Sequence, residues 1–232
     1  MSKAVLISIQ PKWCELIANG QKTIEVRKSR PKLETPFKVY IYCTLQGSNK
    51  FFKNILNGNI SEWNKENWGF KKGKVIGEFI CNKMSEYEAE FHKDNEYYQD
   101  IREIFRYDDN PDDDCRDFKI LTSNDEDNAD DCELCKRSCL SFDDFKNYIG
   151  EGFCNPFYGW HISDLVIYDK PKELSEFYSK CNEICEYCDL WQNVRVNADE
   201  YDMDCSSDYY GHKPIKRPPQ SWCYVEECGD NA

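Results

Sequence analysis

The chain has 232 residues, of which 40% are hydrophobic and 31% are charged, and it carries 13 Phe, 15 Tyr and 6 Trp. These aromatic side chains can fill the core of one domain and argue against a disordered chain. No apolar run approaches the roughly 18 residues of a transmembrane helix, and the short apolar N-terminal run ends without a cleavage site. We therefore expect a cytoplasmic protein without membrane contact.

The formal net charge of −13 is distributed unevenly along the chain. Residues 107–133 carry twelve acids and two bases, whereas residues 1–38 carry eight bases and three acids. The field near a binding surface matters more for contact with phosphate than the total charge does. The overall excess of acid therefore does not exclude a nucleic-acid partner.

The expected elements are mostly short strands. Apolar runs with alternating or continuous patterns predict strands at residues 4–9, 23–28, 37–44, 74–81, 158–168 and 218–226. Helices are expected at residues 12–19, which end at Gly20, and at residues 141–148, which begin at Ser141. Many short strands with few helices predict a mainly β fold with short helices, organised as a small β-barrel.

Two polar stretches interrupt this pattern. Residues 82–137 form an acidic insertion with a first cysteine cluster, and residues 178–216 form a second cysteine-rich insertion. Neither stretch carries enough apolar residues to fold by burial alone. We expect residues 1–232 to be a single domain that carries both insertions.

Most of the fourteen cysteines are clustered rather than scattered. Thiolates separated by two or three residues can converge on a tetrahedral zinc ion, and reducing conditions make structural disulfides improbable. We expect one or two structural zinc ions that fasten the insertions, with free thiols or a redox role as the alternatives. The expected ligands are Cys132, Cys135 and Cys139 (with Cys115 or Cys154) in one group, and Cys181, Cys185, Cys188 and Cys205 (or His212) in the other.

Residues 20–27, Gly-Gln-Lys-Thr-Ile-Glu-Val-Arg, concentrate charge beside a helix end. Lys22 enters the strand, and Glu25 and Arg27 share one strand face because residues two apart point the same way. Arginine offers a planar fork for a phosphate or a base edge, and lysine offers a mobile point charge. The segment is therefore a candidate binding site.

This octet resembles the Gly-x-Lys-x-x-Glu-x-Arg signature of the ASCH domains, a branch of the PUA-like β-barrels. The order of elements agrees over roughly residues 3–81 and 138–170, with residues 217–226 closing the barrel. The resemblance implies a PUA-like fold with a cleft suited to RNA, a nucleotide or a modified nucleoside. The residues that would line this cleft are Lys22, Glu25 and Arg27.

One tryptophan and one histidine also bear on this expected cleft. Trp68, just ahead of a lysine pair, is the residue expected to stack on a base at the mouth of the cleft. His161 follows Trp160 on an expected strand. We expect His161 to be a satisfied structural group, because no Cys or Ser motif accompanies it.

The sequence leaves open whether this protein is an enzyme. Some bacterial ASCH proteins are similar to amidohydrolases acting on acetylated cytidine, which implies Lys22 as a base, but Glu25 stands where their Thr would be. An adjacent carboxylate should raise the pKa of Lys22 rather than lower it. A hydrolase, either this amidohydrolase or a ribonuclease, is the first alternative, with Glu78 or Tyr42 as a second catalytic group. A zinc-stabilised protein-interaction module is the second alternative, although the sequence identifies no partner protein.

Overall fold

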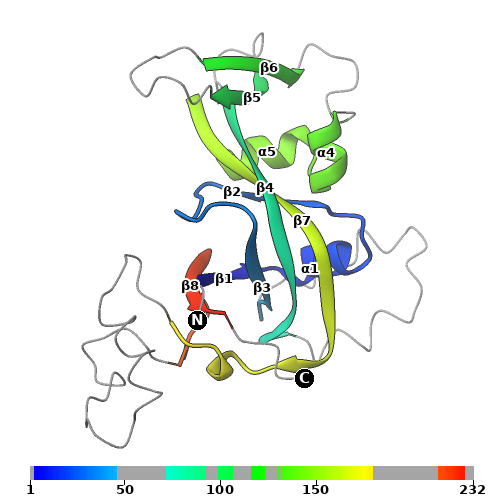
Figure 1. Ribbon diagram of the computed structural model, residues 1–232. Helices are drawn as coiled ribbons and strands as arrows, with labels where there is room; N and C mark the ends of the chain where they lie inside the picture. Colours follow the sequence, from blue (N-terminus) through cyan, green and yellow to red (C-terminus); the bar gives the residue numbers. More distant parts are fainter. Residues whose placement is uncertain are drawn as a thin grey trace, which may run out of the picture. The chain divides into compact units, whose positions relative to one another are not determined.

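A computed structural model describes residues 3–45, 72–91, 99–106, 116–123, 130, 132–179 and 214–227 (Figure 1). Strands dominate this part of the chain and its helices are short, so the expected mainly β fold is confirmed. None of its helices is long and apolar enough to cross a membrane. By its internal contacts the chain divides into two compact units. The first comprises Met1–Glu15, Phe37–Phe79 and Asp164–Ala232, and the second comprises Leu16–Pro36 and Ile80–Ser163.

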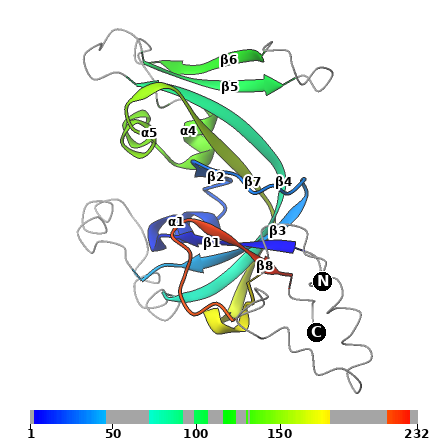
Figure 2. The same ribbon diagram turned by 90° about the vertical axis from the view of Figure 1, so that its left-hand side faces the viewer.

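The first unit is built around strand β1 (Lys3–Ile9). β1 pairs in parallel with β3 (Phe37–Cys43) and antiparallel with β8 (Trp222–Glu226), and Figure 2 shows β8 alongside it. From Ala4 to Ile9 every residue of β1 is buried. A continuous apolar run fits a strand covered on both faces. The short α1 (Pro11–Ala18) follows β1 directly.

Two long strands, β4 (Lys74–Phe91) and β7 (Gly152–Lys172), are neighbours in the sheet and contribute residues to both units. In the first unit they approach closely at Gly77, where an added Cβ would lie 2.3 Å from the carbonyl oxygen of Val166. The nearby core includes the ring of Tyr40 against Phe177, just after the 3₁₀ turn η2 (Leu174–Glu176), with ring centroids 4.9 Å apart.

The second unit continues these strands. β2 (Ile24–Arg27) pairs antiparallel with β7, which places Ile24 opposite His161. At the other side, β5 (Asp100–Arg106) pairs with the end of β4, and β6 (Arg116–Ser123) pairs with β5. The helices α4 (Glu133–Ser138) and α5 (Phe142–Ile149) lie beside each other in both views.

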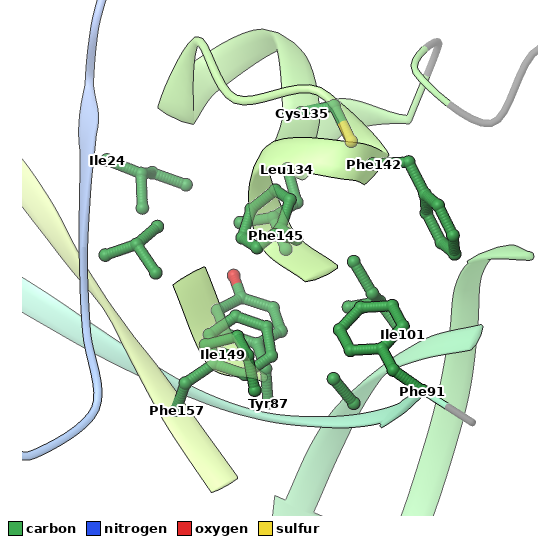
Figure 3. Close-up of a cluster of buried hydrophobic side chains, with 12 residues drawn as sticks. Ile24, Tyr87, Phe91, Ile101, Leu134, Cys135, Phe142, Phe145, Ile149 and Phe157 are labelled. Carbon is green, nitrogen blue, oxygen red and sulfur yellow. The ribbon is translucent and has the colours of Figure 1, made fainter. Parts of the chain in front are cut away.

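The core of the second unit forms between α5 and the strands (Figure 3). Ser141 caps α5 in a reciprocal capping box with Asp144, which fixes where the helix begins. The buried face of α5 packs its aromatic residues on β4 and β7, where the rings of Tyr87 and Phe157 stack at 5.2 Å. The residues that α5 buries are Phe142, Phe145 and Ile149.

β4 and β7 extend further than the sequence pattern predicted, whereas β2, β3 and β8 are shorter. β4 continues to Phe91 rather than ending at Cys81, and β5 and β6 occupy part of residues 82–137. The described strands follow the order β2-β7-β4-β3-β1-β8, and they form an open mixed sheet rather than a closed barrel. This arrangement is consistent with a mainly β, PUA-like fold. The expectation of a single domain stays a prediction.

Phe145→Ala should lower the free energy of unfolding by about 3–5 kcal/mol, because it opens a cavity in a fully buried aromatic cluster. Urea titration followed by tryptophan fluorescence measures this loss. Asn147→Ala, at an exposed position of the same helix, is the matched control and should change stability by less than about 0.5 kcal/mol. Equal effects of the two variants would contradict the packing described for α5.

Candidate functional site

The three signature side chains meet at the start of β2. The main chain leaves α1 through Gly20, whose φ of +72° suits glycine, and the N–H groups of Gln21 and Lys22 donate to the carbonyl of Leu16. Lys22 Nζ lies 3.4 Å from Glu25 Oε2, and an Arg27 guanidinium nitrogen lies 3.0 Å from Glu25 Oε1. The two cations therefore share one carboxylate.

The cluster is buried more deeply than a strand surface would be. Lys22 is 3% exposed and Glu25 is 5% exposed, while Arg27 is partly exposed. Lys22 Nζ also donates to the carbonyl oxygen of Ser138 at 2.6 Å, at the end of α4. The signature lysine is thus held by a carbonyl and a carboxylate from different parts of the second unit. Arg27, whose side chain is 11% exposed, is the most accessible of the three side chains, although its Nε is buried.

Burial lowers the pKa of Lys22, and the attraction of Glu25 opposes this effect without reversing it. Glu25 therefore acts on the pKa of Lys22 in the expected direction, but burial outweighs it and the net shift is downward. The reason is that Lys22 is almost completely desolvated, which the sequence did not show. A lysine in this environment releases its proton more readily than one in water.

Tyr148 was not recognised as a site residue from the sequence. It is 39% exposed, and the Nζ of Lys28 lies 5.4 Å from the centre of its ring. Burial of its hydroxyl raises the pKa of Tyr148, whereas Arg27 acts to lower it, so the phenol lies in the field of the signature residues. The helical pattern contained a signal: at about 100° per residue, position 148 lies well off the centre of the buried face of α5.

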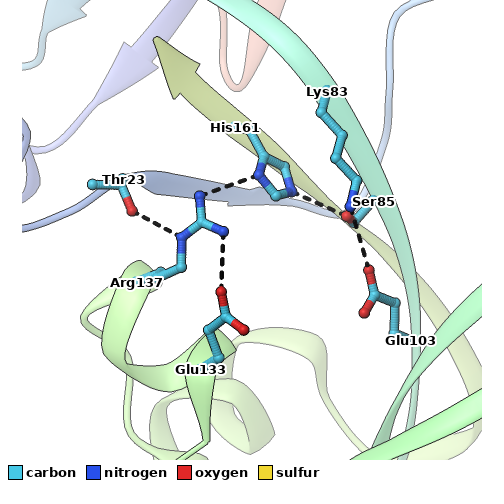
Figure 4. Close-up of polar contacts among 7 residues, drawn as sticks. All are labelled: Thr23, Lys83, Ser85, Glu103, Glu133, Arg137 and His161. Carbon is cyan, nitrogen blue, oxygen red and sulfur yellow. Dashed lines mark hydrogen bonds and ion pairs between the residues drawn. The ribbon is translucent and has the colours of Figure 1, made fainter.

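A second polar group surrounds His161 (Figure 4). Arg137 donates to His161 Nδ1 at 3.2 Å, donates to Thr23 Oγ1 at 3.1 Å and pairs with Glu133. His161 Nε2 lies 3.0 Å from Ser85 Oγ. Because a guanidinium only donates, Nδ1 accepts and the proton of the neutral ring is on Nε2, which donates to Ser85.

This direction of hydrogen bonding has a chemical consequence. A histidine that activates a serine must accept the hydroxyl proton, whereas His161 donates to Ser85. Burial and the positive charges of Arg137 and Lys83 lower the pKa of His161 to about 4, so the ring is neutral near pH 7. His161 is a satisfied structural group, as the sequence suggested.

The first cysteine group divides between the two ends of α4. The sulfur atoms of Cys132 and Cys135 are 2.9 Å apart at its beginning, whereas Cys139 is the C-cap and its sulfur lies 3.8 Å from the carbonyl oxygen of Lys136. The hydrogen bond with Cys135 lowers the pKa of Cys132 to about 7, and the same contact raises the pKa of Cys135.

Within the described ranges, no group of three or more His, Cys, Asp or Glu side chains is placed to hold a metal ion. The second expected zinc group lies outside the described residues. The same holds for the residues expected to complete the two zinc sites and for Trp68, the residue expected to stack on a base. Zinc therefore stays a prediction, which native mass spectrometry of the full chain tests. The residues concerned are Cys181, Cys185, Cys188, Cys205, His212, Cys115, Trp68 and, for its side chain only, Cys154.

The two candidates for a second catalytic group, Glu78 and Tyr42, belong to the first unit. Glu78 pairs with Lys38 and accepts a hydrogen bond from the hydroxyl of Tyr168. Tyr42 is buried, which raises its pKa. Each of these side chains has a structural role within its own unit.

No family model and no curated protein matches this sequence. Solved structures that match include ASCH from Zymomonas mobilis, with 13% identity and a TM-score of 0.45 over 97% of this chain and 88% of that one. A Tyr-to-Phe variant of that protein matches with 14% identity and a TM-score of 0.43, over 97% and 92%. A Ser-to-Ala variant matches with 13% identity and a TM-score of 0.39, over 97% and 89%.

The matched structures carry the name of the family whose signature residues 20–27 resemble. Their TM-scores are all below 0.5.

His161→Gln should flatten the dependence of stability on pH between about pH 4 and 6.5. The folded-state pKa of about 4 is below the ordinary 6.5, so the unfolded chain binds the extra proton in this window and stability falls as the pH falls. The slope is at most about 1.4 kcal/mol per pH unit. Urea titrations of both proteins at several pH values measure it. The Gln amide preserves both hydrogen bonds, so parallel pH profiles would disprove a buried neutral ring.

Lys22→Met should leave the free energy of unfolding at pH 7 unchanged or slightly higher. The lowered pKa means that the buried site disfavours the ammonium relative to water, and Glu25 keeps its contact with Arg27. A residue retained at a cost in stability is expected at functional sites. Chemical denaturation measures the effect. A loss of about 3–5 kcal/mol would instead show that Lys22 serves as half of a structural ion pair.

Proposed function

We propose that this chain is an ASCH-like module that binds RNA, a nucleotide or a modified nucleoside at the signature cluster. Arg27, Lys28 and Tyr148 would contact the ligand, and Lys22 and Glu25 would support them from beneath. The resemblance of residues 20–27 to the ASCH signature supports this assignment, as does the local excess of bases in residues 1–38.

The observation that carries the proposal is the grouping of the exposed Lys28 and the partly exposed Arg27 with the exposed ring of Tyr148. The guanidinium of Arg27, which contacts Glu25 through one nitrogen, would donate to a phosphate from its outer side, and Lys28, whose ammonium donates to the carbonyl of Ile149 at 3.2 Å, adds a second positive charge. The exposed ring of Tyr148 offers a face on which an unpaired base can stack. Phosphate contact together with base stacking is the general mode by which proteins bind single-stranded RNA.

The buried residues of the cluster would hold Arg27 in place. Glu25 contacts the Arg27 guanidinium, Lys22 contacts Glu25, and the Ser138 carbonyl accepts a hydrogen bond from Lys22. Each side chain is therefore positioned by the next, down to the main chain of α4. A preorganised cation loses little conformational freedom when a ligand binds, which favours affinity.

Lys28→Ala should weaken binding of a fluorescein-labelled single-stranded RNA 12-mer, measured by fluorescence anisotropy over a series of salt concentrations. If Lys28 contacts one phosphate, the slope of log affinity against log salt should become shallower by about 0.7. Lys119→Ala removes the same charge from an exposed position on β6 and is the matched control. An equal loss of affinity in Lys28→Ala and Lys119→Ala would show that only the overall charge matters, which would argue against this site.

Tyr148→Ala should weaken the same complex by roughly 5- to 150-fold, with an unchanged salt slope, because a base–aromatic stack contributes about 1–3 kcal/mol. Tyr148→Phe keeps the ring and should bind nearly as well as the unmodified chain. Isothermal titration with the RNA 12-mer and with single nucleoside monophosphates measures both variants. Full affinity of Tyr148→Ala would remove stacking from the proposal.

A hydrolase at the same position is a second candidate, which one observation favours. The lowered pKa of Lys22 increases the fraction of neutral amine, the form needed in a general base. The assay is release of acetate from N4-acetylcytidine and cleavage of the RNA 12-mer. Turnover by the unmodified chain that disappears in Lys22→Met, while RNA binding persists, would establish catalysis. Absence of turnover of both substrates leaves binding as the function of the cluster.

A further inference from the structure

The pair of cysteines at the beginning of α4 has a geometry that the nucleotide-binding proposal does not use. Cys132 is the N-cap residue and is partly exposed, while Cys135 is 3% exposed. Their sulfur atoms lie 2.9 Å apart, and the backbone N–H of Cys135 donates to the sulfur of Cys132 at 3.2 Å. A reachable thiol is thus held directly against a protected one.

This separation is close to that of a covalent bond between the two atoms. A disulfide has a sulfur–sulfur distance of about 2.05 Å, so closure requires an approach of only about 0.9 Å from the observed 2.9 Å. Both residues lie within one turn of the chain, so no other element has to move. Other described cysteines differ, since Cys14, Cys43 and Cys81 are buried and occupy α1, β3 and β4.

We propose that Cys132 and Cys135 form a redox-active dithiol that a low-molecular-weight disulfide, such as glutathione disulfide, converts reversibly to an intramolecular disulfide. The proposal is independent of the nucleotide-binding function, because it concerns the chemistry of two thiols only. It also differs from the zinc prediction, in which both sulfurs would be held as metal ligands.

The reaction proceeds in two exchanges that balance. The exposed sulfur of Cys132, having released its proton to water, attacks glutathione disulfide, which forms a mixed disulfide and releases one glutathione thiolate that takes up a proton. The sulfur of Cys135 then attacks the Cys132 sulfur, which forms the internal disulfide and releases the second glutathione. Two protein thiols are oxidised, and one glutathione disulfide is reduced to two thiols.

The position of the pair connects this chemistry to the rest of the second unit. The far end of the six-residue α4 carries the Ser138 carbonyl that accepts from Lys22 and the Arg137 side chain that bonds His161. The carbonyl of Arg137 also accepts from the N–H of Thr23. A disulfide across the first turn of α4 would fix the helix on which these contacts depend.

The full-length protein is equilibrated in buffers of increasing ratio of glutathione disulfide to glutathione, alkylated with iodoacetamide and digested with trypsin. Cleavage after Lys119 and Lys136 places Cys132 and Cys135 together in residues 120–136, whereas Cys139 falls in a separate peptide. We expect residues 120–136 to lose both alkyl groups and two hydrogens together, and dithiothreitol to restore them. Cys139 should stay alkylated at the ratio where this conversion is half complete.

Variants assign the two roles. Cys135→Ser should accumulate the glutathione mixed disulfide on Cys132, because no second thiol resolves it, and Cys132→Ser should leave Cys135 reduced. Cys139→Ser is the matched control and should leave the conversion unchanged. Circular dichroism checks that each variant is folded, and the measurement on the unmodified chain stands without them.

Three results would overturn the proposal. The first is alkylation of both cysteines at every ratio of glutathione disulfide to glutathione. The second is oxidation of Cys139 at the same ratio as the pair, which would indicate unselective thiol chemistry. The third is protection of Cys132 and Cys135 by bound zinc, seen as alkylation that appears only after a chelator removes the metal.

Discussion

The candidate site of the second unit is organised around one buried cation. Lys22 places its ammonium group between the carbonyl of Ser138 and the carboxylate of Glu25, with almost no contact with water. Residues that are 116 positions apart in the chain are joined by the first of these contacts. A buried charge is tolerated only where partners surround it, so the end of α4 and the start of β2 must keep their positions for this site to exist.

Two sets of polar side chains join β2 and α4 to their neighbours. Glu25 and Arg27 form an ion pair, in which Arg27 is the more accessible member. Arg137, His161 and Ser85 form a relay, in which hydrogen bonds run in one direction from a guanidinium to a neutral imidazole and on to a hydroxyl. The first set is the one that the proposed phosphate contact uses, whereas the second links α4, β7 and β4.

Local charge and the position of the signature strand were predictable from the sequence. Gly20 follows the end of α1. Glu25 and Arg27 are two residues apart on β2, so strand geometry alone predicts that their side chains are in contact. The burial of Lys22 was not predictable, because it depends on Ser138, which belongs to a distant segment. The net lowering of its pKa followed from that burial, whereas the sequence showed only the opposing effect of Glu25.

The lengths of the strands show a similar division. The buried alternation of Ser85, Tyr87, Ala89 and Phe91 was present in the sequence, but three intervening glutamates made the segment resemble an acidic insertion. The expected closed barrel could not be tested by periodicity, because closure is a property of strand order. Within the described residues that order ends at β2 and β8 and carries β5 and β6 as a branch from β4, so the sheet is open.

The close approach of β4 and β7 at Gly77 also limits how the sequence of this protein can vary. Every amino acid other than glycine carries a Cβ, which here would fall 2.3 Å from a main-chain oxygen that no rotamer change can move. Alanine at this position meets the same obstacle as tryptophan, so side-chain size is no guide to tolerance. In a saturation library selected for folded protein, codon 77 should be reduced to glycine regardless of the chemistry of the replacement.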